Sequence, residues 1–279
     1  MAFKTLLTVL TSPRIEASAL EDAIVLARGY DAHLEVICLG LDRSHAAEYQ
    51  LGVNATVMHA AIEQAHEKAE KIQSAARPVL ENSGVRWDIS DAVSMAGDAG
   101  RAVVHAGRFA DMAVLPLPYG EDVQSEDSAV LEALLIDAHC PVCVVPPKAT
   151  APATPETVMI AWNESPEALR AIRAALPVLQ SAASVHIAII DPPAHGTDRS
   201  DPGGALATWL SRHGVHCDIQ IMSRSGGKVS DRLAQHALET GAGLLVMGGY
   251  GHSRFREAVL GGATRYMLEN ARVPVLMMH

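Results

Sequence analysis

Three apolar segments of the first half of this chain recur in the same order in its second half. An ordered repeat of this kind predicts two copies of one structural unit, and 279 residues are enough for two ordinary domains. The matching segments are 4–13 with 156–165, 110–116 with 242–248, and 141–145 with 274–278.

A proline-rich segment separates the two copies. Residues 146–155 contain four prolines, each of which lacks a backbone N–H and fixes its own φ. Such a segment cannot form a helix or a central strand and is typical of a linker. We therefore predict a first domain at residues 1–147, a linker at 148–155 and a second domain at 156–279.

Strand-like and helix-like segments alternate within each copy. This alternation predicts an α/β fold with two tandem doubly wound, Rossmann-like domains, each a five-stranded and mainly parallel sheet flanked by helices. In the second half the expected strands lie near 157–162, 185–190, 215–222, 244–248 and 274–278, and the expected helices near 166–178, 202–213, 228–241 and 262–271.

Local signals mark two helix starts and one unusually long helix. Ser165 followed by Pro166 is typical of an N-cap with proline at the first helical position. Ser18 and Glu21 have the spacing of a capping box. The second helix of the first half should span about 55–82, much longer than its counterpart in the second half.

Composition and charge exclude several classes of protein. Hydrophobic residues make up 49% of the chain, yet no apolar run approaches the ~18 residues that span a membrane. Residues 1–150 carry 11 Lys and Arg against 21 Asp and Glu, whereas residues 151–279 carry 11 of each. This acidic balance argues against nucleic acid as a partner. Four cysteines without a disulfide pattern suit the cytoplasm.

The end of the second half contains a glycine-rich turn between two apolar runs. Residues 244–247 are followed by Gly248, Gly249 and Gly251, and nine residues later by Gly261 and Gly262 at the start of an expected helix. Glycine lets backbone amides approach a ligand closely, and a helix start supplies free N–H groups with a positive dipole end. The pattern predicts a phosphate site. The alternative is a turn that only reverses the chain.

The spacing Gly248-x2-Gly251-x9-Gly261 resembles the ATP-binding signature of the universal stress protein family, and the resemblance extends over nearly the whole chain. It implies a tandem, two-domain member with an adenine pocket at the reversal of strand order, between the first and fourth strands. The residues that the resemblance assigns to the adenine pocket are Ala161, Asn163, Ile189 and Met247. Those that it assigns to the phosphates are Gly248, Gly251, His252, Ser253, Arg254, Gly261, Gly262, Ala263 and Thr264.

The chain departs from the family pattern at two of these positions. Gly262 stands where the family has Ser or Thr, and Asn163 stands where it commonly has Asp, which removes a charge and adds a donor. The 13 histidines show no compact metal-ligand spacing, so any magnesium should arrive with the nucleotide. No catalytic residue is identified.

The first half has lost the glycine pattern. Where the second half has Met247 to Gly251, the first has Leu115-Pro116-Leu117-Pro118-Tyr119, and the two prolines remove two amide donors. The residue that corresponds to Asn163 is Thr11. We therefore expect one competent site, in the second half, with the first half serving structure, dimerisation or partner binding.

Three interpretations of function follow from the sequence. The resemblance implies a stress-response binding module that is regulated by ATP. The same pocket could instead serve a slow ATPase or nucleotidyl-transfer enzyme, although no positioned base or acidic metal pair is recognisable. The third interpretation is a nucleotide-free interaction scaffold.

The last strand of each half, 141–145 or 274–278, is apolar and is expected at a sheet edge. Such edges favour pairing, either with each other in antiparallel fashion within the chain or in a homodimer. Cys140 and Cys143 have the spacing of a redox motif, but because they enter a strand we interpret them as buried thiols.

Overall fold

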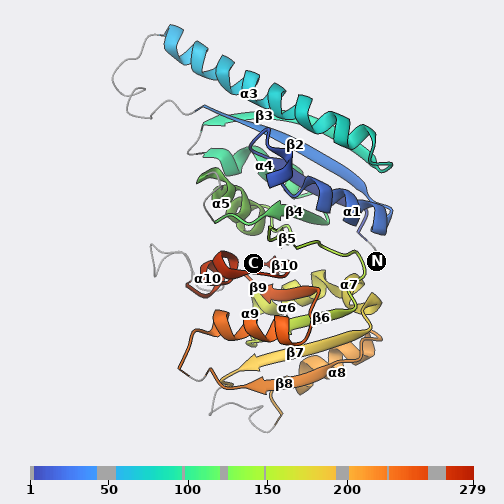
Figure 1. Ribbon diagram of the computed structural model, residues 1–279. Coiled ribbons are helices and arrows are strands. Elements are labelled where there is room, and N and C mark those ends of the chain that lie inside the picture. The colour runs from blue at the N-terminus through green and yellow to red at the C-terminus, as the bar shows by residue number, and fades with distance from the viewer. Residues whose placement is uncertain are drawn as a thin grey trace. The chain divides into compact units, whose positions relative to one another are not determined.

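The computed structural model describes residues 3–42, 55–95, 98–119, 125–147, 149–192, 201–224, 226–250 and 262–279 (Figure 1). The chain divides into two compact units, Phe3–Cys140 and Pro141–His279. Strands and helices alternate along both units, as the repeat predicts. Among the described residues, no helix is both long and apolar enough to cross a membrane.

The first unit is built on parallel strands in the order β3-β2-β1-β4. Its strands are β1 (Thr5–Leu10), β2 (His33–Asp42), β3 (Arg86–Met95) and β4 (Met112–Pro116). Its helices are α1 (Leu20–Tyr30), α3 (Ala55–Glu81), α4 (Ala99–Gly107) and α5 (Ser125–Glu132), with a 3-10 helix at Ile15–Ala17 and a π-helical turn at Ala133–Asp137 that continues α5. The long helix expected at 55–82 is therefore confirmed as α3.

The second unit has the strand order β5-β10-β9-β6-β7-β8. Its strands are β5 (Val142–Val145), β6 (Thr157–Ala161), β7 (Ser184–Ile190), β8 (Asp218–Met222), β9 (Leu244–Gly248) and β10 (Val275–Met278). Its helices are α6 (Pro166–Ala174), α7 (Leu176–Ser181), α8 (Gly204–Arg212), α9 (Val229–Glu239) and α10 (Gly262–Asn270). The α/β class with a mainly parallel sheet flanked by helices is confirmed.

One antiparallel pair joins the last strands of the two sequence repeats. Val275 lies opposite Val144 and Leu276 lies opposite Cys143, and every residue of β5 is buried. The pairing places β5 in the second compact unit, although β5 closes the first repeat in the sequence. The antiparallel pairing within the chain that the apolar edges predict is confirmed.

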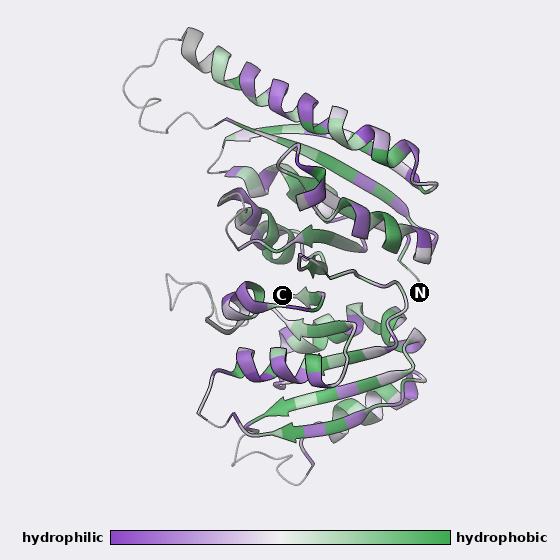
Figure 2. Ribbon diagram, in the orientation of Figure 1, coloured by the Kyte–Doolittle hydropathy of each residue, from purple (hydrophilic) through white to green (hydrophobic). Residues whose placement is uncertain are grey.

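Aliphatic side chains on the strands form the core. Figure 2 shows hydrophobic residues concentrated on the strands and hydrophilic residues along α3 and α9. The inner strands β1 and β9 are buried nearly throughout rather than on alternate residues. This pattern is typical of parallel strands that are covered by helices on both faces.

The two predicted helix caps have different outcomes. The Ser165 hydroxyl accepts a hydrogen bond from the Ala168 N–H at 3.1 Å, and Pro166 follows it, so this N-cap is confirmed. The capping box at Ser18 is wrong, because α1 begins at Leu20 with Ala19 as its N-cap. A 3-10 turn precedes the helix, and the Ser18 hydroxyl donates to the Ile15 carbonyl of that turn at 2.6 Å.

Candidate functional site

The strand order of the second unit reverses at β6. Ile160 of β6 lies opposite Ile187 of β7 on one side and opposite Val246 of β9 on the other. The chain runs from β6 outward to β7 and β8 and then returns through α9 to β9 (Figure 1). In open α/β sheets, ligands bind outside the carboxyl ends of the strands at such a reversal. The candidate site therefore lies at the carboxyl ends of β6, β7 and β9.

Three residues assigned to the adenine pocket lie at nearly one level on these strands. Ala161 ends β6 and is opposite Ala188 of β7, so Ile189 lies one residue farther along. Met247 follows Val246, the partner of Ile160, which puts Met247 beside Ala161. Ile189 and Met247 are buried, and Ala161 is half-buried.

The turn after β6 is organised by the side chain of Asn163. The Asn163 Oδ1 accepts a hydrogen bond from the Ser165 N–H at 3.2 Å. Glu164 between them has φ of 62°, which is uncommon for a residue with a side chain. The Asn163 oxygen is therefore used to start α6, and the side-chain amide nitrogen of this exposed residue can still donate a hydrogen bond.

Gly248 and Gly249, at the end of β9, have different structural roles. A Cβ on Gly248 would lie 2.6 Å from the backbone nitrogen of Ala168, so only glycine lets the first turn of α6 lie against this strand. The Gly249 N–H donates to the Met278 carbonyl at 2.9 Å and continues the ladder with β10. Sequence reasoning missed both tasks, because each depends on a residue far away in the chain.

The hydroxyl of Thr264 connects α10 to the turn after β9. Its Oγ1 accepts a hydrogen bond from the Tyr250 N–H at 3.3 Å, and the Thr264 side chain is only 6% exposed. Tyr250 has φ of 56°, so the chain turns sharply here without a glycine. The start of α10 is thereby held beside the end of β9.

The remaining residues assigned to the phosphates are only partly described. Gly262 and Ala263 form the first residues of α10, which begins as predicted. The other five lie outside the described residues, and they are Gly251, His252, Ser253, Arg254 and Gly261. Their assignment to the phosphates stays a prediction.

Two cations lie where β8 leads into α9, and the sequence did not single them out as ligand groups. Asp191, which follows β7, pairs with the Arg224 Nε at 3.4 Å and accepts from the Arg224 N–H at 3.2 Å. The Lys228 Nζ lies 3.1 Å from the centre of the Tyr266 ring of α10. Within the described ranges Lys228 has no carboxylate partner, and no three His, Cys, Asp or Glu residues gather to hold a metal ion.

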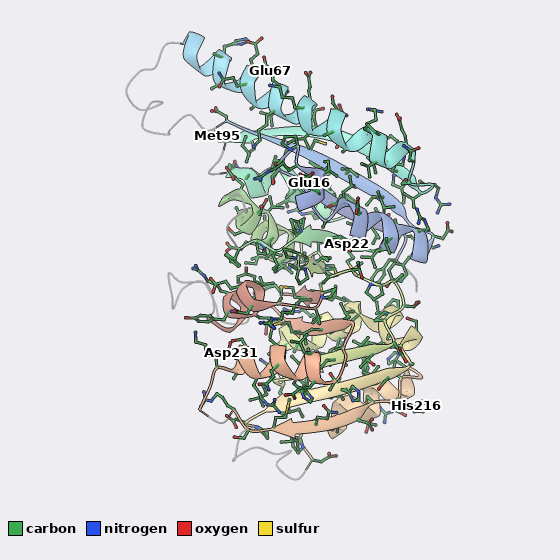
Figure 3. All side chains as sticks on the ribbon, viewed as in Figure 1. Glu16, Asp22, Glu67, Met95, His216 and Asp231 are labelled. Carbon is green, nitrogen blue, oxygen red and sulfur yellow. The ribbon has the colours of Figure 1, made fainter. Side chains whose placement is uncertain are left out.

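A cavity of about 590 Å³ lies at the opposite edge of the sheet. It is lined by the start of β7, the last turn of α8 and the segment around His216, which Figure 3 labels beside β8. These are the amino ends of the strands. We therefore do not assign the predicted nucleotide to this cavity.

In the first unit, a hydrogen bond connects the end of the reversal strand to the helix beside it. β1 is the reversal strand there, because it pairs with β2 on one side and β4 on the other. The hydroxyl of Thr11, directly after β1, donates to Asp127 Oδ1 of α5 at 2.8 Å. Glu126, the preceding residue of α5, is only 4% exposed. Carboxylates thus lie in the first turn of α5, the helix that follows the fourth strand of its repeat as α10 does in the second unit.

The cysteines of the apparent redox motif are buried free thiols, as the sequence predicts. Cys140 and Cys143 are both buried, and neither forms a disulfide. Burial raises the pKa of Cys140 to about 12, and burial also raises the pKa of Cys38 to about 12. The reactive thiolate form is therefore scarce at both residues at neutral pH.

We expect thiol reagents to distinguish the cysteines in the folded protein. At pH 8, Cys217 should be alkylated first, because it is half-buried whereas the other three are buried. Cys38 and Cys140 should react only after urea unfolds the chain. Mass spectrometry of peptides after timed alkylation measures the order, and rapid modification of native Cys140 would contradict it.

Comparisons with known proteins agree with this arrangement. Residues 218–279 match the model of the universal stress protein family. None of the curated proteins is significantly similar to the chain in sequence.

Solved structures resemble the chain over almost its whole length. A universal stress protein from Archaeoglobus fulgidus DSM 4304 has 16% identity and a TM-score of 0.70, with 98% of this chain and 97% of that chain covered. A protein provisionally named a universal stress protein, from Pseudomonas aeruginosa UCBPP-PA14, has 18% identity and a TM-score of 0.63, with 99% and 93% covered. A protein of unknown function from Pseudomonas aeruginosa PAO1 has 16% identity and a TM-score of 0.61, with 99% and 92% covered.

The matched segment runs from β8 to the end of the chain and so contains β9, the glycine turn and α10. The structural matches extend the same fold to both halves of the sequence repeat. Residues 218–279 therefore match the model of the universal stress protein family, and the chain as a whole shares the fold of solved universal stress proteins.

Proposed function

We propose that the second unit binds ATP at the carboxyl edge of its sheet, with any magnesium carried by the nucleotide, and that this binding regulates a response to stress. The observation that carries the proposal is the contact between Thr264 and Tyr250, which holds the start of α10 beside the end of β9 next to the reversal strand. A helix start in this position presents free N–H groups to an anion. The family match includes this whole region.

The adenine base would lie at this apolar level, where Ala161 and Met247 share one face of the sheet and Ile189 points to the other face. Asn163 is the polar group beside this level, and its amide can donate to a ring nitrogen of the base. The family commonly has Asp here, which would accept instead, so the substitution changes the direction of this hydrogen bond.

The phosphates would lie at the start of α10. Backbone amides of Gly262 and Ala263 belong to the free N–H groups of that helix. Family spacing adds Gly248, Gly251 and Gly261, together with His252, Ser253 and Arg254. Because the Gly249 N–H is already bonded to β10, we leave it out of the phosphate site. Lys228, at the start of α9, supplies a cation toward the same edge.

A direct test is to identify the ligand that the purified protein carries. Mass spectrometry of small molecules released by denaturation should detect an adenine nucleotide. The matched control is Gly261→Val, purified in parallel, which should release none. Equal release from both proteins would mean that the nucleotide binds elsewhere.

We expect one ATP per chain. The first unit has Thr11 bonded to Asp127 across the corresponding place, and carboxylates there repel phosphates. Titration calorimetry of the full chain should therefore give a stoichiometry near one. Two equivalent sites per chain would contradict the assignment of binding to the second unit alone.

We also propose a homodimer in the cytoplasm, where free cysteines stay reduced. The pairing of β5 with β10 already uses the apolar edges, so the dimer needs another surface. Ile221 on the outer strand β8 is 56% exposed and supplies one. Light scattering should give about twice the 29.6 kDa mass of the chain, and Ile221→Glu should halve it. A monomer with and without ATP would refute the dimer.

A further inference from the structure

The hydrogen bond between Thr11 and Asp127 joins the two elements that border the reversal point of the first unit. Thr11 follows β1, the reversal strand, and Asp127 lies in the first turn of α5, the helix after β4. The Thr11 hydroxyl is a donor at 2.8 Å from Asp127 Oδ1, and the Thr11 residue is only 9% exposed. The bond is therefore a partly buried contact, with Thr11 buried and Asp127 half-buried.

Asp127 occupies a position that favours an oxyanion. It is the third residue of α5, and the first turn of a helix has N–H groups without helical acceptors and the positive end of the dipole. A carboxylate and a phosphate satisfy these groups in the same way. The first turn of α10 in the second unit has no acidic residue at all, since Gly262 is followed by Ala263 and Thr264.

We propose that the Asp127 carboxylate is a built-in substitute for a bound phosphate. It gives the start of α5 a permanent negative charge and fastens it to β1 through Thr11. The first unit is thereby held in the arrangement that a ligand would give it, and it does not respond to nucleotide. The inference relies on the proposed function only in taking phosphate as the oxyanion of the second unit.

Anion rescue tests this proposal. The double variant Glu126→Gln/Asp127→Ser removes both negative charges from the first turn of α5. The smaller serine also leaves space for an anion where the Asp127 carboxylate was. We expect inorganic phosphate to raise the thermal unfolding midpoint of this variant by roughly 3 °C or more relative to sodium chloride of equal ionic strength. Hydrogen exchange of residues 125–132 should slow at the same time, which locates the anion at α5. The same protein with Glu126 and Asp127 intact should show neither effect.

All variants carry Gly261→Val, so that phosphate bound in the second unit cannot contribute to the measured stability. The result therefore tests the proposal about Asp127 even if the second unit does not bind ATP. Asp137→Ser, at the far end of the same helical segment, is the matched control for loss of one negative charge. Thr11→Val removes the donor but keeps the carboxylate, and should show no rescue.

Equal stabilisation of the Asp137→Ser control would mean general screening of an acidic unit and would overturn the proposal. If phosphate does not stabilise a folded Glu126→Gln/Asp127→Ser protein, the proposal is also overturned. Asp127 would then only connect α5 to Thr11 through a hydrogen bond. If the double variant does not fold, Asp127→Ser alone is used in the same assay, with a smaller expected shift because Glu126 remains.

Discussion

Replacing Gly251 or Gly261 by valine should abolish ATP binding to the second unit while the chain stays folded. A β-branched side chain would enter the space of the phosphates and demand a backbone conformation that valine resists. We expect affinity to fall at least about 100-fold, which corresponds to roughly 2.7 kcal/mol. Titration calorimetry measures the affinity, and circular dichroism checks the fold.

A matched control for this experiment lies in the same unit. A Cβ on Gly227 would meet nothing closer than the Arg224 carbonyl oxygen at 3.6 Å, so Gly227→Val should leave the affinity close to that of the wild type. Unchanged affinity in the folded Gly251→Val/Gly261→Val protein would reduce the glycine pattern to a turn that reverses the chain.

Gly248→Val should have its largest effect on stability. A Cβ at this residue would lie 2.6 Å from the Ala168 nitrogen and 2.9 Å from the Glu167 carbonyl carbon, and both atoms belong to the backbone of α6. The helix must move away from β9, and overpacking of this kind costs up to roughly 3 kcal/mol. Urea unfolding measures this loss in the free energy of unfolding.

The ATP affinity of Gly248→Val should fall as well, because the displaced helix follows directly on the turn that Asn163 organises. Gly227→Val again serves as control, with a free energy of unfolding near that of the wild type. A Gly248→Val protein of normal stability that cannot bind ATP would show that Gly248 acts on the phosphates rather than in packing.

The sequence alone determined where most strands and helices of the second unit lie. Apolar periodicity located the strands that end in Ala161 and Gly248 to within about one residue, and Ser165 identified the start of α6. The repeat and its apolar edges also predicted the pairing of β5 with β10. These features depend on patterns within a few residues or on a comparison of one repeat with the other, and both can be read from the chain.

Only the tertiary structure decided how individual groups are used. The Ser18 hydroxyl donates to a preceding turn and accepts from the Leu20 N–H instead of forming a capping box with Glu21. The Gly249 amide bonds to β10 instead of remaining free. Gly248 is required by the closeness of α6, and Thr11 is joined to Asp127, a residue 116 positions away. A local sequence pattern shows which hydrogen-bond donors and acceptors a residue has. Which partner reaches each group depends on segments brought together by folding, and no local pattern contains that information.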